Sequence, residues 1–323
     1  MERIAVIGSG LMGHGIAQAF AVQGYPVVVH DTSPAALASV TQRIEANLRA
    51  LGIPEAAAAA IKLEDSLPAA VSGADFVIET VSENLELKRR IFTELASLTC
   101  PDCVLASNTS VIPIGEIASG TGAESRILGM HWWNPPYLIP LVEVVQAAAT
   151  DPKYIDQSID LLKRLGKMPV HVRRDVPGFV GNRLLHALYR EAISIVEAGI
   201  CDAATVDLVV KNSFALRLPV LGPLEHVDLV GLDLVLAIQK YVFPDLERST
   251  EPSPLLKQNV EEGRLGMKAG HGFYDWTPQS AQAVHDGLLA HLRAIVDNHR
   301  RNPPSRGTLD PSNPRGAPTA KPE

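Results

Sequence analysis

The chain has 323 residues, 46% of them hydrophobic, three cysteines and a formal net charge of −7. This size suits a globular protein of about two domains, and so few cysteines exclude a disulfide scaffold. No basic cluster indicates nucleic acid, no uncharged apolar run could span a membrane, and no signal or transit peptide is visible. We therefore expect a cytoplasmic protein that acts on a small molecule, without nucleic-acid or membrane partners.

The first residues predict a dinucleotide-binding turn. A short apolar strand, Ile4–Ile7, leads into Gly8-Ser-Gly-Leu-Met-Gly13, and helical spacing of apolar residues follows. Strand, glycine turn and helix in this order are typical of a pyrophosphate site. Gly8 permits the tight turn, Gly10 lets the backbone approach the pyrophosphate, and Gly13 lets helix and strand pack closely. The N–H groups at the helix start then face the phosphates, so the predicted cradle comprises Gly8, Gly10, Leu11, Met12 and Gly13.

The second strand indicates which dinucleotide binds. Val27–Val29 ends in His30-Asp31, and no arginine follows directly. A carboxylate at this position accepts hydrogen bonds from the adenine ribose hydroxyls and repels a 2′-phosphate. Asp31 therefore favours NAD over NADP.

The rest of the first half continues the alternation of helices and strands. We expect a helical region over Pro34–Ile61, a third strand at Ala74–Ile78, a charged helix at Leu85–Leu98 and a fourth strand at Val104–Ala106. The ends of parallel strands meet at one edge, where open sheets bind ligands. Ser110, just past the fourth strand, is a candidate to hold a substrate oxygen, and a helix-capping role is the alternative.

Cys100 and Cys103 have the spacing of a redox or metal pair. No second pair would complete a zinc site, and the motif precedes a strand instead of beginning a helix. We therefore interpret these cysteines as structural.

A symmetric hairpin is predicted to bring a histidine to a carboxylate. Two apolar runs, Ile127–Trp133 and Leu138–Val145, flank an Asn-Pro-Pro turn that cannot continue a ladder. His131 and Glu143 each lie six positions from Tyr137, so a reversal there places them face to face. A histidine held at one ring nitrogen by a carboxylate has its other nitrogen free to take a proton. This pattern outlines a general base.

The second half is predicted to be mostly helical. Three isolated histidines, His186, His226 and His271, are interpreted as polar residues of helix faces or loops. Beyond about residue 300 no apolar period survives, which favours a disordered, proline-rich tail. The expected elements are a helix from Asp151-Pro152 to Leu165, a strand at Met168–Val172, a turn from Asp175, a helix at Phe179–Ala198, a helix capped by Asp202, and a helix from Gly222-Pro223 towards Phe243.

Taken in order, the motifs resemble those of the 3-hydroxyacyl-CoA dehydrogenase family, from Arg3 to about Trp276. They are Gly8-x-Gly-x-x-Gly13, Val81–Asn84 with Lys88, Ala106–Ser110, His131-x-x-Asn134-Pro, Leu141–Val144, Asp175–Phe179 with Asn182-Arg183, Gly222–Glu225, Asp228–Asp233 and Lys268–Tyr274. The resemblance implies an α/β protein: a Rossmann-type, doubly wound, mostly parallel sheet over residues 1–174 and an all-helical domain over 175–299, before the tail at 300–323. It also implies a homodimer made by the helical domain.

The resemblance assigns roles to individual residues. It implies that His131 takes the hydroxyl proton while hydride passes to NAD, that Glu143 orients His131, and that Ser110 and Asn182 hydrogen-bond the substrate oxygen. It also implies that the nicotinamide half of the NAD site is lined by Glu83, Lys88, Asn134 and Lys268. The expected reaction is the oxidation of L-3-hydroxyacyl-CoA to 3-oxoacyl-CoA, as in fatty acid metabolism.

Two departures from the family pattern concern the substrate. The segment after Asn134-Pro is Pro136–Pro140, where the acyl-CoA enzymes usually carry a Val-Pro-Val-Met-Lys type sequence. The helix that meets the CoA phosphates in those enzymes is lysine-rich, whereas Arg49–Glu55 is nearly bare of positive charge. The Pro-Pro-Tyr version is similar to relatives that oxidise free acids, such as carnitine, gulonate and pyridoxine-degradation dehydrogenases. CoA thioesters remain the expected substrate class, and free hydroxy acids or hydroxymethyl and formyl pyridine carboxylates are the alternative.

Two other readings stay open. Phosphogluconate and hydroxyisobutyrate dehydrogenases share the Gly-x-Met-Gly turn but use a lysine on a glycine-rich interdomain helix, where this chain has Pro177–Arg183. A catalytically silent NAD-binding protein, like the relative that serves as a lens crystallin, is the alternative from another class. Retention of His131, Glu143, Ser110 and Asn182 argues for an enzyme.

Overall fold

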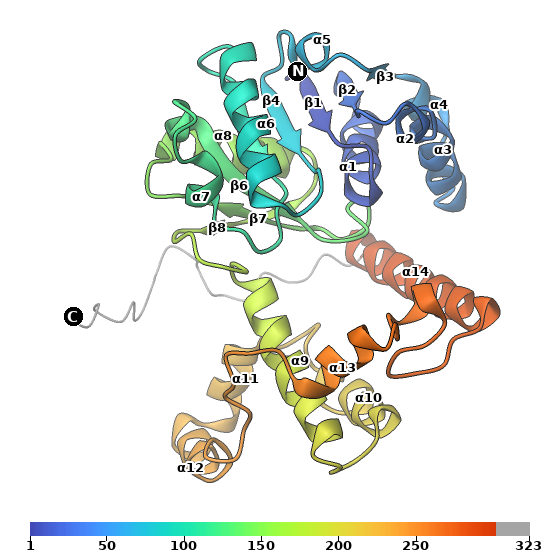
Figure 1. The fold of residues 1–323 in the computed structure, drawn as a ribbon, viewed down its shortest axis with the longest axis vertical. Helices are drawn as coiled ribbons and strands as arrows, with labels where there is room; N and C mark the ends of the chain where they lie inside the picture. The colour runs from blue at the N-terminus through green and yellow to red at the C-terminus, as the bar shows by residue number, and fades with distance from the viewer. Residues whose placement is uncertain (302–323) are drawn as a thin grey trace.

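The fold is that of a computed structural model, which describes residues 1–301. One eight-stranded sheet runs through the N-terminal half in the order β3-β2-β1-β4-β5-β6-β7-β8 (Figure 1). The first six strands in chain order are mutually parallel, and β7 and β8 run antiparallel to them. The strands are β1 (Ile4–Ile7), β2 (Val27–His30), β3 (Ile61–Glu64), β4 (Phe76–Glu79), β5 (Val104–Ser107), β6 (Ile127–Trp132), β7 (Leu141–Val145) and β8 (Met168–Val172).

Helices cover both faces of this sheet. One face packs against α1 (Leu11–Val22), α3 (Val40–Ala50) and α8 (Pro152–Arg164). The other packs against α5 (Leu67–Val71), α6 (Leu85–Leu98) and α7 (Ile114–Ala118). Because both faces are covered, strands β1, β2, β4 and β5 are apolar at nearly every position. The strand order 3-2-1-4-5-6 is that of the Rossmann fold.

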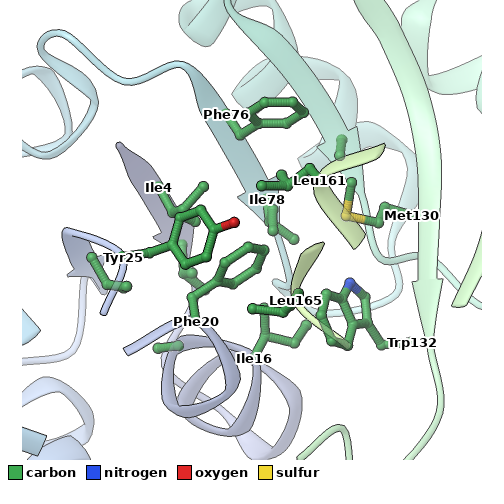
Figure 2. Packing of buried hydrophobic residues seen from close by; sticks show 14 of the residues in the cluster. Ile4, Ile16, Phe20, Tyr25, Phe76, Ile78, Met130, Trp132, Leu161 and Leu165 are labelled. Atoms are coloured by element: carbon green, nitrogen blue, oxygen red, sulfur yellow. The ribbon is translucent and has the colours of Figure 1, made fainter. Parts of the chain in front are cut away.

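The larger of the two cores contains a cluster of aromatic rings between the sheet and α1 (Figure 2). Phe20 meets Tyr25 edge-on with ring centroids 5.5 Å apart, and its ring lies 5.9 Å from that of Trp132. Burying each such side chain stabilises the fold by about 1.5–3 kcal/mol. Trp132 directly follows His131, so this packing also fixes the backbone that carries the histidine.

The prediction of a helical region over Pro34–Ile61 holds up to its end, where a strand that was not predicted begins. The region contains α2 (Pro34–Ala38), α3, α4 (Ala56–Ala59) and then β3, which pairs in parallel with β2. Ile61-Lys-Leu-Glu64 has only four residues, too few for alternation to be distinguished from a helix end. Pairing with β2, more than thirty positions earlier in the chain, decides its structure.

The C-terminal part is helical, and the predicted fold class is confirmed. Two details differ from expectation: Gly231, with φ of 99°, divides the segment from Pro223 to Phe243 into two helices, and a long final helix was not predicted. Except for Arg300 and Arg301, which end that helix, the predicted disordered tail lies outside the described residues. The helices are α9 (Gly181–Glu197), α10 (Ala203–Asn212), α11 (Pro223–Val230), α12 (Leu232–Val242), α13 (Pro254–Glu261) and α14 (Pro278–Arg301).

The C-terminal helices bury few of their apolar side chains within one chain. None of the residues of α10, α11 and α12 is buried, and Leu224 and Tyr241 are 78% and 90% exposed. Large exposed apolar surfaces mark sites of association. Within residues 1–301, no helix combines the length and the apolar character that a membrane crossing requires.

Candidate active site

The predicted juxtaposition of His131 and Glu143 is confirmed. β6 and β7 pair antiparallel with His131 directly opposite Glu143. The His131 Nδ1 atom lies 2.9 Å from Glu143 Oε2. Both residues are buried, with exposed fractions of 3% and 1%. The chain therefore reverses direction at the Asn-Pro-Pro turn, as the symmetry about Tyr137 predicts.

Glu143 also binds the start of a helix in the second domain. Its Oε1 accepts hydrogen bonds from the N–H groups of Val180 (3.0 Å) and Gly181 (3.1 Å). Burial alone would raise the pKa of Glu143, but the hydrogen bonds from His131, Gly181 and Val180 together outweigh it and lower the pKa. An ionised carboxylate only accepts hydrogen bonds, so Nδ1 of His131 must carry a proton.

His131 is held so that its second nitrogen is available. Its ring packs between Trp133 and Phe179, with centroids 5.1 Å and 5.8 Å away. Within residues 1–301, the one hydrogen bond of the imidazole ring is that between Nδ1 and Glu143. With the proton on Nδ1, the lone pair of Nε2 is free to accept another proton. This geometry suits a general base.

Ser110 and Asn182 come together across the two domains. The Asn182 side-chain amide donates to the Ser110 carbonyl oxygen at 2.9 Å, and the Ser110 N–H donates to Glu83 at 3.0 Å. Asn182 is the second residue of α9, whose start is fixed by Glu143. The four residues predicted to act in catalysis are therefore connected by hydrogen bonds and by the first residues of α9.

The glycine turn leaves open space beside Gly10 and is tightly packed at Gly13. A Cβ atom on Gly13 would lie 1.8 Å from the Gly8 carbonyl oxygen, whereas one on Gly10 would meet nothing within 4 Å. Gly8 has φ of 97°, which favours glycine. The open space at Gly10 adjoins the N-terminus of α1, where backbone N–H groups and the helix dipole favour an anion. The cradle fits NAD.

Asp31 lies against this turn. Its Oδ2 accepts from both the N–H and the hydroxyl of Ser9 at 2.7 Å, and its Oδ1 from the Ser33 N–H at 2.8 Å. Burial alone would raise the pKa of Asp31, but the bonds from Ser33 and Ser9 outweigh it and lower the pKa. The carboxylate at the end of β2 is therefore ionised at neutral pH.

Sequence reasoning missed two residues that brace the cradle. Arg43 of α3 donates to the Ser9 carbonyl oxygen, and its Nε is buried without a partner within residues 1–301. The Thr80 hydroxyl donates to the Gly8 carbonyl oxygen at 2.8 Å and fills the space that a side chain at Gly13 would need. Neither belongs to a motif, because both reach the turn through tertiary packing.

Lys88 is buried and forms ion pairs with two glutamates. It is 1% exposed, and its ammonium lies 2.7 Å from Glu79 and 3.5 Å from Glu83. Glu79 also accepts from the Ser107 hydroxyl at 2.7 Å. Burial of Glu79 raises its pKa, with Lys88 opposing that shift. The buried side chain ties the ends of β4 and β5 to Glu83, and its contact with the cofactor stays a prediction.

Asn134 and Lys268 lie in different elements of the fold. Asn134 is exposed in the turn after β6, in a segment that Lys167 fastens by donating to the carbonyl oxygens of Pro136 (2.6 Å) and Ile139 (2.9 Å). Lys268 lies in a short 3-10 helix (Met267–Ala269) and lines a small cavity built from residues 256–273 alone. Within residues 1–301, no hydrogen bond or ion pair joins Lys268 to the sheet.

The cysteine pair shows no catalytic features. Cys103 is fully buried, and burial raises the pKa of its thiol to about 12. Its thiolate is therefore scarce at neutral pH. No group of three or more His, Cys, Asp or Glu residues in the described part of the chain could hold a metal ion.

This combination of fold, cradle and buried histidine places the chain among the NAD-dependent dehydrogenases that act on CH–OH groups. Models of the 3-hydroxyacyl-CoA dehydrogenase NAD-binding domain and C-terminal domain match residues 3–176 and 178–276. The chain belongs to the 3-hydroxyacyl-CoA dehydrogenase family.

A dehydrogenase named for a pyridine carboxylate and one named for an acyl-CoA are similar to this chain at nearly equal sequence identity. The 5-formyl-3-hydroxy-2-methylpyridine 4-carboxylate 5-dehydrogenase of Mesorhizobium japonicum is 37% identical over 300 residues, covering 91% of this chain and 97% of that protein. The 3-hydroxybutyryl-CoA dehydrogenase of Bradyrhizobium diazoefficiens is 36% identical over 289 residues, covering 85% and 96%.

Solved structures show the same two kinds. A crystal structure of the pyridine carboxylate dehydrogenase, described as an NAD+ dependent dismutase, superposes with a TM-score of 0.85 at 35% identity, covering 91% of this chain and 97% of that one. The (S)-3-hydroxybutyryl-CoA dehydrogenase of Ralstonia eutropha gives a TM-score of 0.71 at 32% identity, covering 86% and 99%.

Proposed function

We propose that this dehydrogenase oxidises a CH–OH group of a small free carboxylic acid, either an alcohol or the hydrate of an aldehyde, with His131 as the general base. The observation that carries the proposal is the buried pair of His131 Nδ1 and Glu143 Oε2 at 2.9 Å. This bond leaves Nε2 as the proton acceptor, at the sheet edge where the dinucleotide cradle lies.

In the proposed reaction, each residue acts on a stated atom. Bound NAD supplies the hydride acceptor. His131 takes the hydroxyl proton at Nε2, and Glu143 stabilises the resulting imidazolium. Asn182 and Ser110 hold the substrate oxygen at the start of α9. A general base of this kind contributes about 10²–10⁴-fold in rate.

For the cofactor, we propose that the turn holds the pyrophosphate and that Asp31 accepts hydrogen bonds from the adenine ribose. Glu83, Lys88 and Asn134 border the nicotinamide half, and Lys88 also forms an ion pair with Glu83. Lys268 is proposed to complete that half of the site. The turn residues are Gly8, Gly10, Leu11, Met12 and Gly13.

Charge near α3 favours a free acid over a CoA thioester. Arg43 is bonded to the Ser9 carbonyl oxygen, and Arg49 forms a 2.8 Å ion pair with Glu55. Arg49 therefore already has a carboxylate partner, and Arg43 is engaged at the glycine turn. CoA phosphates need charge-assisted bonds, and these two arginines are the cations that the helix offers. The likeness to a dehydrogenase named for a pyridine carboxylate supports the same choice. The family name and the 3-hydroxybutyryl-CoA relatives support CoA thioesters as the second candidate.

We also propose that the chain forms a homodimer through its helical domain. The exposed apolar faces of α10, α11 and α12 need a cover, and a second copy supplies a matching apolar face. Light scattering should give twice the 34.7 kDa of one chain. A monomer at micromolar concentration would contradict this proposal.

The substrate class is tested by NADH absorbance. Purified enzyme is assayed in both directions with acetoacetyl-CoA, with free 3-hydroxy acids, and with 5-formyl-3-hydroxy-2-methylpyridine 4-carboxylate. We expect turnover with one or more free acids and little with the thioester. If acetoacetyl-CoA is the one compound turned over, the substrate class is the CoA thioesters. If none of the compounds is turned over, the proposal that the protein is an enzyme of this kind is wrong.

A further inference from the structure

A cleft of about 790 Å³ runs along α9, and Asn182, one of the proposed catalytic residues, lines it. At one end it is lined by Asn182 and by Val111, the residue after Ser110. Apart from Val111 and residues within 177–197, its lining residues lie within 247–256, which spans the end of the α12–α13 connection and the first turn of α13. A substrate bound to Asn182 would therefore extend its remaining atoms into this cleft.

One face of α9 presents basic side chains to the cleft. Arg183, His186 and Arg190 recur at helical spacing and all line it. Arg183 and Arg190 each make one long hydrogen bond to a backbone carbonyl oxygen, at 3.4 Å. Within residues 1–301, neither arginine has a carboxylate partner. Both are therefore free to bind an anion.

The carboxylates that line the same cleft have partners of their own. Glu197 accepts from the Ser253 hydroxyl at 2.9 Å and from the Leu255 N–H at 3.1 Å. Glu247 accepts from the Ser249 N–H, and Glu251 lies 3.6 Å from the Lys257 ammonium. By helical rise, Glu197 lies about 22 Å along the axis from Asn182 and Arg190 about 12 Å. Along α9, the basic residues of the cleft thus lie nearer to Asn182 than Glu197 does.

We propose that Arg190 and His186 form a subsite that binds the carboxylate of the substrate. Helical side chains lean towards the N-terminus of their helix, so the long Arg190 side chain leans back towards Asn182. The planar guanidinium can donate two parallel hydrogen bonds to a carboxylate. The His186 ring, edge-on to Tyr189 with centroids 5.6 Å apart, supplies a further donor. This inference rests on the proposed function and makes its substrate class specific.

The test compares an acid with its neutral counterpart in matched variants. The probes are 3-hydroxybutyrate and 5-formyl-3-hydroxy-2-methylpyridine 4-carboxylate, each beside its methyl ester. The variants are Arg190→Met, Arg190→Lys and, as a control, Arg90→Met, which removes an exposed arginine of α6 outside the cleft. Steady-state kcat/KM is measured for each, together with the KM for NAD.

We expect the parent to prefer the acid and Arg190→Met to lose about 10- to 100-fold in kcat/KM for the acid alone. Arg190→Lys should lose less, while Arg90→Met and the KM for NAD should not change. An unchanged acid preference in Arg190→Met, or equal use of acid and ester by the parent, would overturn the subsite. If the parent oxidises no acid but turns over acetoacetyl-CoA, the proposed substrate class fails and the subsite fails with it.

Discussion

Glu143 joins His131 to the second domain: one carboxylate oxygen takes the histidine Nδ1, and the other takes two N–H groups at the start of α9. The same carboxylate thus orients the proposed base and fixes the helix that carries Asn182. A single side chain therefore positions His131 relative to the start of the helix that carries Asn182.

Replacing Glu143 with glutamine should therefore impair catalysis more than binding. The amide keeps the shape of the side chain but cannot stabilise a charged imidazole, and it competes to donate where the carboxylate only accepts. We expect kcat to fall by about 10²-fold or more, with NAD affinity largely retained. Steady-state kinetics and calorimetric titration with NAD measure the two effects. An E143Q enzyme with parental kcat would show that the carboxylate is structural.

The glycine turn offers a paired test. Gly13→Ala would put a Cβ atom 1.8 Å from the Gly8 carbonyl oxygen, so we expect loss of both NAD binding and stability. At Gly10 the structure leaves open space, so Gly10→Ala should fold normally and still bind NAD more weakly. Thermal melting and NAD titration separate the outcomes. Full NAD binding by Gly10→Ala would place the pyrophosphate elsewhere.

Lys88→Met tests the buried ion pair under the site. It would leave Glu79 without its cation in a fully buried position. Breaking such a pair from one side costs about 3–5 kcal/mol. Urea unfolding should report this loss, and the double variant Lys88→Met/Glu79→Gln should recover part of it. A loss below about 1 kcal/mol would mean that water reaches Glu79.

Because of Lys167, the free energy of unfolding should vary with pH in the alkaline range. Burial lowers the pKa of its ammonium from 10.5 to about 8. Between these values the unfolded chain holds one more proton than the folded chain, so the free energy of unfolding rises with pH. Comparing urea midpoints of parent and Lys167→Met from pH 7 to 10.5 isolates this contribution. We expect the difference between parent and variant to move in the parent's favour above about pH 8, and a constant difference would contradict the assignment.

Much of this site could be predicted from the sequence because its signals are local. The glycine turn needs specific residues at fixed spacing, and the symmetry of His131 and Glu143 about Tyr137 follows from the period of a strand. The N-cap of α8 was also visible in Asp151-Pro152, and the Asp151 side chain accepts from the Lys153 N–H.

What the sequence did not predict depends on distant contacts. β3 is a strand because β2 lies beside it. Arg43 and Thr80 reach the turn only in the folded chain, and no motif contains them. α14 is different: Val284, Leu288, Leu292 and Ile295 have helical spacing, so a local pattern does indicate this helix.

The most direct measurement is turnover by His131→Gln, with NAD binding measured on the same protein. Glutamine can still hydrogen-bond but cannot take a proton at neutral pH. The account predicts a fall in kcat of about 10²–10⁴-fold with unchanged NAD affinity. Equal turnover by variant and parent would contradict the role of His131 as the base.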